Sequence, residues 1–347
     1  MDRRQLIGLT GALGLGTLLG GCAIPAISSG VTQFADAVVP PPDKGEPVGT
    51  PLAAFAEDLN RRLAPTTKNL IWSPWSVAMV LAMVRDGAAG ATASEFDKLL
   101  RADASFDAAL ADGWRRMAHA EGDPLHAANS VWGQAGMTWK TPFRDKLTAL
   151  SASFKVADFK ARASQVEEEI NAWVSDHTAK KNPKLLDGDV DSTNRLVLVN
   201  AVHFKAPWQT EFIDLPKAPF RAPGKQVDTP YLQGSEPFQG WRADGWTLAS
   251  VPCKGLEFNL NVALPDDPAA NPASLPMEVL LGSASIDPGF SSILIALTMP
   301  AWKQRFEAHL NEVLIAAGIP TAFTPSADFS AMTDDDRLHL GFVVHEA

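Results

Sequence analysis

The side chains able to do catalytic or metal chemistry are scattered along this chain. Seven histidines and two cysteines show no spacing that would ligate a metal. The sequence contains no phosphate-binding glycine loop, no histidine pair of a zinc protease and no nucleophile elbow. Asp334, Asp335 and Asp336 form a dense acidic group, which we interpret as a solvated loop. The sequence therefore predicts no enzyme activity, no cofactor and no metal site.

Cys22 is the cysteine with a clear chemical context. It follows Leu19-Gly20-Gly21, which resembles a bacterial lipoprotein box, where small residues precede a cysteine that is lipidated after cleavage. Upstream lie Arg3-Arg4 and an apolar run over residues 6–19 that is too short to span a bilayer. We predict that residues 1–22 are a signal peptide and that acyl chains on Cys22 tether the mature protein to a membrane.

This leader implies an exported protein, either a cell-envelope lipoprotein or an extracellular protein. Two alternatives stay open. Cys22 could simply follow an ordinary signal peptide, and the arginine pair fits both the twin-arginine and the general export route.

Residues 23–51 are rich in proline, glycine and serine, which is typical of a linker. Residues 52–347 are expected to form the folded domain. The formal net charge is -10 and the pI is about 5.2. An acidic chain without a basic stripe argues against a nucleic-acid partner, and it leaves the lipid on Cys22 as the route to a membrane.

Asn200 is an amide in the middle of an otherwise apolar stretch, residues 196–204. The stretch is rich in β-branched residues and lacks alternation, which predicts a strand buried on both faces. Burying an amide without partners costs about 1–3 kcal/mol. We therefore expect other polar groups to meet Asn200 in the fold.

Ser73 and Ser76 stand at the start of an apolar helix. Serine followed by Pro74 is a strong helix start. Residues 77–84 have no polar face, which predicts a central, buried helix. Ser76 either bonds back to this helix or reaches a neighbouring buried polar group.

Periodicity and capping signals predict the remaining elements of a mixed α+β fold. Helices are expected at 52–63, 143–150, 166–177 and 306–317, and capping boxes at 92–95 and 164–167. Strands are expected at 69–72, 126–132, 154–159, 256–264, 293–299 and 338–345.

Groups of residues along the chain also match the pattern of one known family. They are Asn69, Ser73, Pro74, Ser76, Met83, Gly87, Gly90 and Glu95; Ile170, Asn171 and Trp173; residues 196–205 with Trp208; and Leu297, Met299, Pro300, Gly318, Phe323, Asp328, Phe329 and His345. This pattern resembles the serpins and runs from about residue 52 to the end. The resemblance implies a large mixed β-sheet, further β-sheets and about eight or nine surrounding helices.

The resemblance also implies a mechanism. In a serpin, a serine protease cleaves an exposed reactive loop, which then inserts as a new strand into the large sheet and distorts the acyl-enzyme. The implied partner is a serine endopeptidase. The implied site is a polar cluster beneath the opening strands, formed by Ser73, Ser76, Asn200 and His345. Trp208 would lie where insertion begins. Alternatively, each of these polar residues is satisfied separately.

In serpins, the residues after the position of His345 supply the rest of a central strand, a hinge, the reactive loop and the last core strands. This sequence ends at Ala347. We therefore expect a C-terminally incomplete serpin domain, 52–347, without a reactive bond of its own. The alternative function is a non-inhibitory surface protein that captures an extended peptide at an open sheet edge.

Overall fold

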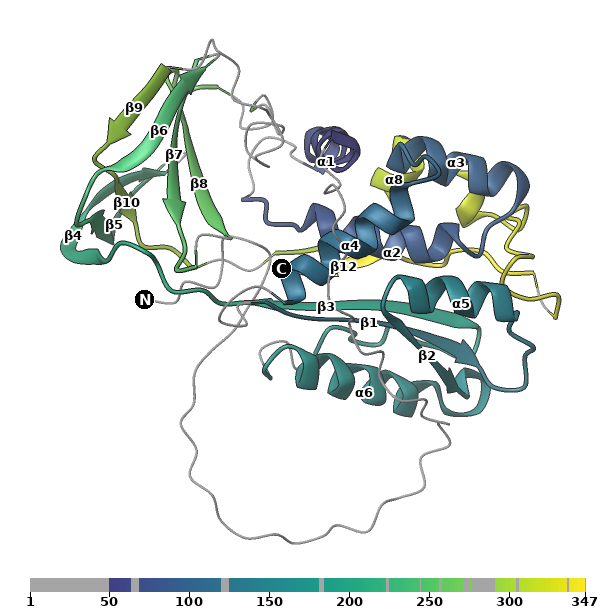
Figure 1. Ribbon diagram of the computed structural model, residues 1–347. Coiled ribbons are helices and arrows are strands. Elements are labelled where there is room, and N and C mark those ends of the chain that lie inside the picture. Colours follow the sequence, from purple (N-terminus) through teal and green to yellow (C-terminus); the bar gives the residue numbers. More distant parts are fainter. Residues whose placement is uncertain are drawn as a thin grey trace, which may run out of the picture.

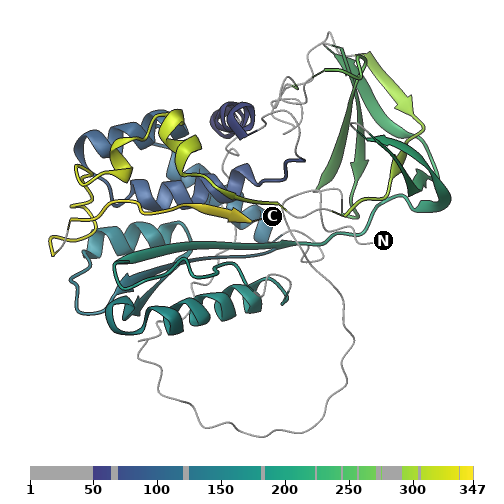
Figure 2. The same cartoon turned by 180° about the vertical axis from the view of Figure 1, so that it is seen from behind.

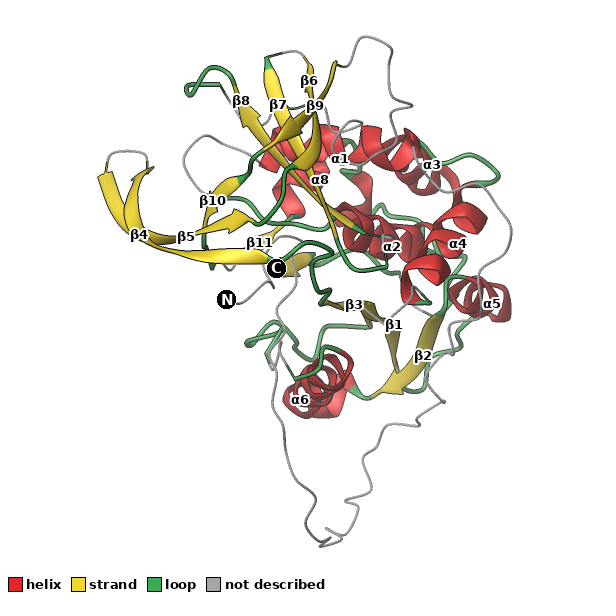
Figure 3. Cartoon of the chain, turned by 60° about the vertical axis from the view of Figure 1, so that its left-hand side comes forward, coloured by secondary structure: helices red, strands yellow, loops and turns green. Residues whose placement is uncertain are grey.

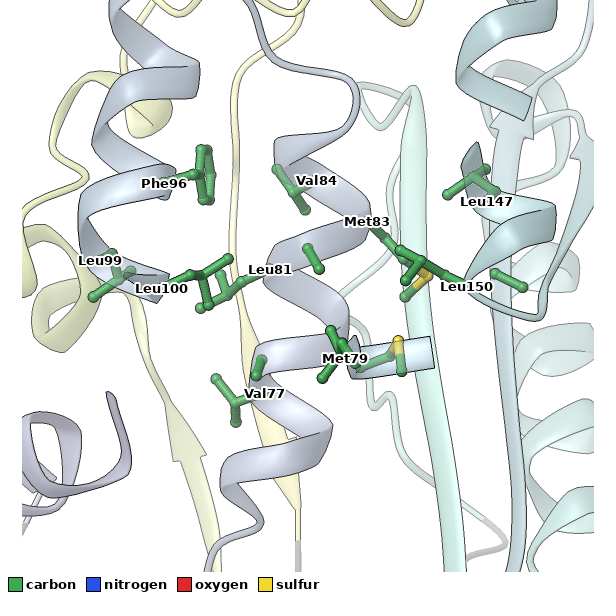
Figure 4. Packing of buried hydrophobic residues seen from close by; sticks show 14 of the residues in the cluster. Val77, Met79, Leu81, Met83, Val84, Phe96, Leu99, Leu100, Leu147 and Leu150 are labelled. Atoms are coloured by element: carbon green, nitrogen blue, oxygen red, sulfur yellow. The ribbon is translucent and has the colours of Figure 1, made fainter. Parts of the chain in front are cut away.

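Helix α2 (Pro74–Arg85) is the centre of the main core. Its N-terminus is capped as predicted, because the Ser73 hydroxyl accepts a hydrogen bond from the Ser76 amide at 3.2 Å and Pro74 occupies the first turn. Figure 4 shows α2 between two other helices, and its apolar side chains point to both sides. The neighbours are α3 (Gly90–Leu100) and α5 (Thr141–Ala149). The prediction of a buried central helix is confirmed.

The computed structural model describes residues 50–346 except 64–68, 120–124, 181–183, 223–224, 244, 256–257, 271–274, 276–290, 304–305 and 336. The predicted signal peptide, Cys22 and residues 23–49 of the predicted linker lie outside the described residues. Helix α1 (Thr50–Leu63) begins the described fold and coincides with the helix predicted at 52–63.

A three-stranded sheet lies beside α2. Its order is β2-β1-β3, with β1 parallel to β2 and antiparallel to β3. Helices α2, α4 and α5 cover one face, and α6 covers the other (Figures 1 and 2). The bounds are β1 (Leu125–Gln134), β2 (Ala152–Ala157), β3 (Leu196–Phe204), α4 (Phe106–Ala118) and α6 (Phe159–His177).

Strand β3 is where residues 196–204 were expected, but only one of its faces is fully buried. Val197, Val199 and Ala201 are buried in a cluster under α6. The alternate residues, such as Leu198 and Val202, are half-buried on the α2 side. The prediction of burial on both faces was wrong because the α2 side of β3 borders a cavity.

Two further sheets form the other end of the molecule (Figure 3). One has the order β10-β5-β4 and the other β8-β7-β6-β9. The first contains β4 (Phe212–Ala222), β5 (Lys225–Gly234) and β10 (Thr298–Pro300). The second contains β6 (Phe238–Ala243), β7 (Trp246–Pro252), β8 (Asn259–Pro265) and β9 (Ser291–Ile295). The single strand predicted at 293–299 is thus two strands in different sheets.

The last part of the chain is less regular than its sequence pattern predicts. Helix α8 (Asn311–Ala317) ends at Gly318 as expected, but it starts later than predicted, because Glu307–His309 forms strand β11. Of the strand predicted at 338–345, only its end lies in β12 (Val344–Glu346), which pairs with β11. The preceding backbone bonds to other elements, for example the Leu340 amide to the Ala322 carbonyl of the short η2 helix (Thr321–Phe323).

Three local predictions were wrong, and in the two that concern capping boxes, distant contacts use the capping residues instead. Residues 69–72 form no strand. Helix α3 starts at Gly90, before the predicted capping box, and the Thr92 hydroxyl accepts instead from the Asp328 amide at 3.0 Å. Helix α6 starts at Phe159 with an Asp158 cap, and the carboxylate of Glu167 binds the amides of Gly188 and Val190.

The described residues contain seven α-helices and twelve strands. The large sheet expected from the resemblance is divided there into β2-β1-β3 and the pair β11-β12. Within the described part of the chain, every helix is too short or too polar to cross a membrane.

Candidate functional site

A cavity of about 310 Å³ separates the two parts of the divided sheet. Strand β3 forms one wall, residues 337–345 form the other, and α2 contributes Val77, Val80 and Val84. The two walls run in the same direction, as both views of the ribbon show (Figures 1 and 2). Within the described sheets, β3 pairs only with β1 and β12 only with β11. The cavity therefore lies between the open edge of β3 and a segment of which only the last residues, Val344 and His345, belong to a strand.

Ser73, Ser76 and His345 are joined at one end of this cavity. The Ser73 amide donates to Nε2 of His345 at 3.1 Å, and the Ser73 hydroxyl accepts from the Ser76 amide. Ser76 and His345 both line the cavity. The start of α2 is thereby tied to the C-terminal wall, across 272 positions of sequence.

The imidazole of His345 is neutral in this arrangement. It is 9% exposed, and burial lowers its pKa from 6.5 to about 4. Only the neutral ring has a nitrogen that can accept the Ser73 N–H. Burial and hydrogen bonding therefore favour the same protonation state.

Asn200 also lines the cavity but binds a residue that the sequence analysis missed. Its Nδ2 donates to Oδ1 of Asn129 on β1 at 2.7 Å. Nδ2 of Asn129 in turn donates to the Leu150 carbonyl at 3.4 Å. Asn129 is 1% exposed, so this amide chain satisfies a buried site. Strand β1 also contains His126, Ser130 and Gln134, so Asn129 does not stand out in its sequence as Asn200 does in β3.

Trp208 lies in a different cluster, at the β-rich end. It forms an isolated β-bridge with Cys253, and its ring lies 5.6 Å from that of Phe212. It packs against buried residues such as Leu232 and Phe238. The structure thus brings Ser73, Ser76 and His345 together, with Asn200 on the same cavity, and places Trp208 apart.

The cavity is basic where β3 begins. Arg195 immediately precedes β3, and Arg337 and His339 lie at the start of the opposite wall. Nη1 of Arg195 donates to the carbonyl oxygens of Ser192, Thr193 and Asn194 at 2.8–3.0 Å. These bonds hold the guanidinium at the end of the cavity.

The family model described as Serpin (serine protease inhibitor) matches residues 51–347. This chain belongs to the serpin family. The serpin is 29% identical over 299 residues to the leukocyte elastase inhibitor of Bos taurus, covering 80% of this chain and 78% of that protein. It is also 29% identical to Iris of Ixodes ricinus, covering 84% and 81% of the two chains.

Solved structures agree on the fold of this serpin. Emu ovalbumin (Dromaius novaehollandiae) matches with a TM-score of 0.80 at 22% identity, covering 87% of this chain and 85% of that one. Cleaved Serpin 42Da matches with a TM-score of 0.73 at 25% identity, covering 85% and 83%. The resemblance predicted from the sequence is confirmed. Among the described residues of the serpin, no three His, Cys, Asp or Glu side chains converge on a metal position.

Proposed function

We propose that this serpin inhibits serine proteases as a suicide substrate, with the cavity between β3 and residues 337–345 as the place where a cleaved loop inserts. The main support for this proposal is the cavity. It lies between the open edge of β3 and residues 337–345, and apolar residues such as Val77, Val80 and Leu198 line it, so an added strand could pair with β3 and bury its side chains.

Membership of the serpin family and the likeness to a leukocyte elastase inhibitor support this activity. They also support a role as inhibitor and not as enzyme. In serpins the inserted strand comes from residues beyond the position of His345, and its chemistry selects the protease. The class of serine protease is therefore to be found by experiment.

The test is covalent trapping. The protein isolated from its native cell envelope is incubated with trypsin-like, chymotrypsin-like and elastase-like proteases and analysed on denaturing gels. We expect a band at the combined mass, containing both polypeptides. The same protease inactivated at its serine is the control and should give no such band. Cleavage of the protein by every protease class without a covalent complex would contradict inhibition.

The same cavity supports a second candidate, capture of an extended peptide from another molecule. This function needs no protease. It predicts that a synthetic strand peptide binds stably and raises Tm, while all proteases leave no covalent complex. The two experiments together separate the two functions.

We also infer that the protein is exported and anchored through lipid on Cys22, as a cell-envelope protein. The support is the small-residue segment before Cys22 and the basic, apolar leader. Intact mass of the native protein should start at Cys22 with added acyl chains, and Cys22→Ala should release the protein from membranes. An unmodified mature N-terminus at another residue would contradict anchoring.

A further inference from the structure

The hairpin of β4 and β5 presents an apolar face to solvent. Phe220 on β4 pairs with Val227 on β5, so their side chains lie on one face of the hairpin. Each is 40% exposed, and Ile213, on the same face near the base, is 53% exposed. The opposite face packs into the core of the β-rich end through Phe212 and Leu232. Figure 3 shows the hairpin extending away from the rest of the chain.

Three basic side chains surround the tip of this hairpin. Lys217, Arg221 and Lys225 are exposed, and they form no ion pair within the described part of the chain. Residues 217–227 contain these three cations and no acidic residue, on a chain whose formal net charge is -10. The acidic total therefore hides a local basic group. Apolar side chains flanked by cations are the combination that a membrane surface with anionic lipid attracts.

We propose that the tip of the β4–β5 hairpin is a docking surface for a bilayer that contains anionic lipid. Phe220 and Val227 enter the headgroup region, and the three basic side chains bind lipid phosphates. Each such cation strengthens binding to an anionic membrane about 5-fold. A self-complementary contact with a second copy of the chain is disfavoured, because it brings two sets of three cations together.

This surface adds orientation to the lipid anchor proposed at Cys22. Residues 23–49 can span at most about 90 Å, since an extended chain covers about 3.3–3.6 Å per residue. A tether of that reach lets any face of the domain meet the membrane, whereas the hairpin selects one face. Because β4 and β5 contribute no wall of the cavity, docking leaves the walls of the cavity free of lipid.

The test measures how close the hairpin comes to lipid. An environment-sensitive dye is attached to the full-length protein through Val227→Cys, and Cys253 is buried. The control carries the dye at Ile315→Cys, which is 41% exposed on α8. Vesicles contain brominated phosphatidylcholine, with or without about one third phosphatidylglycerol. We expect quenching of the dye at residue 227 that is at least about 5-fold stronger on the anionic vesicles, and no quenching of the dye at residue 315.

Charge variants locate the effect on the hairpin. Replacing its three basic residues by glutamine should lower the quenching at residue 227 on anionic vesicles at least about 5-fold. The matched control removes the same charge from exposed positions outside the hairpin: Lys98→Gln, Arg101→Gln and Lys160→Gln. This control should keep the full quenching. In the unmodified protein, raising the salt from about 0.1 M to about 1 M should also weaken quenching, because the Debye length falls from about 10 Å to about 3 Å.

Absence of quenching at residue 227 on both kinds of vesicle would overturn the proposal, and a dimer found under those conditions would assign the face to a second copy. Equal quenching on neutral and anionic vesicles would overturn the role of the basic residues. Equal quenching at residues 227 and 315 would indicate adsorption without a preferred face and would also overturn docking. Flotation with the vesicles reports the Cys22 anchor separately: a protein that floats without quenching at residue 227 keeps its anchor and lacks the docking surface.

Discussion

His345 ties the C-terminal wall of the cavity to α2 through a neutral ring. Its pKa is about 4 in the folded protein and near 6.5 when exposed, so the unfolded chain binds more protons between these values. Stability contributed by His345 is therefore complete above about pH 6.5 and is lost as pH falls toward about 4. We expect a loss on the order of 2–3 kcal/mol in the free energy of unfolding across this window, measured by urea unfolding.

The control for this prediction is His345→Gln, whose side-chain oxygen can still accept from the Ser73 amide. His345→Gln should not show this loss of unfolding free energy as the pH falls. The comparison is necessary because Asp86 acts in the opposite direction: burial raises its pKa from 3.8 to about 6, so its contribution is lost as pH rises through about 6. A pH profile that is the same in the variant and the unmodified protein would contradict the role of His345.

The amide pair Asn129–Asn200 joins β1 to β3 beside the cavity. Removing one partner leaves the other without its bond, so Asn129→Ala and Asn200→Ala should each lower the free energy of unfolding by about 1–3 kcal/mol. The double variant should lose less than the sum, because the shared bond is counted once. Additive losses in urea unfolding would show that the two amides are satisfied independently.

At the level of elements, the end of helix α8 depends on Gly318. Its φ is +118°, and a Cβ added there meets no other atom within 4 Å, so substitution costs backbone strain alone. Gly318→Ala should lower the free energy of unfolding by about 1 kcal/mol or more. Gly341→Ala is the matched control, since its Cβ also meets nothing and its φ is outside the left-handed region. An equal loss of stability in Gly318→Ala and Gly341→Ala, measured by thermal unfolding, would contradict a cost from backbone strain at Gly318.

The elements with strong local signals were predictable from sequence. The Ser73-Pro74 start and the apolar run of α2 determine that helix locally, and the stripe Val166, Ile170, Trp173 predicts the buried face of α6. The capping box at 92–95 failed because Thr92 and Glu95 bind the distant segment around residues 321–328. The strand at 338–345 failed because its amides bind the loop and helix beside it. A local sequence pattern cannot reveal hydrogen-bond partners that lie far away in the chain.

Only part of the candidate site could be predicted from the sequence. The resemblance placed Ser73, Ser76 and His345 in one cluster, and hydrogen bonds join these three residues in the structure. It did not name Asn129, which meets Asn200 only through the register of β1 with β3. No sequence motif includes Arg195 or Arg337. Their proximity to one cavity end is a property of the folded chain.

At the scale of the whole molecule, the cavity separates two bodies that meet around α2. The sheet β2-β1-β3 lies on one side with α6, and β11-β12 lies on the other beside α8. Backbone amides at the two facing edges exchange with water unless a strand covers them. The β-rich end, with β4 and β5, shares no wall of the cavity.

Binding of a strand peptide should therefore change hydrogen exchange in a defined part of the chain. Amides of residues 193–204 and 337–346 should exchange more slowly with the peptide bound, because new inter-strand hydrogen bonds cover both edges. Amides of β4 and β5 (residues 212–234) should exchange at an unchanged rate. Exchange measured by mass spectrometry on proteolytic fragments distinguishes these regions. Protection of one wall only would mean that the peptide adds to an edge without bridging the two bodies, and uniform protection would indicate general stabilisation without insertion.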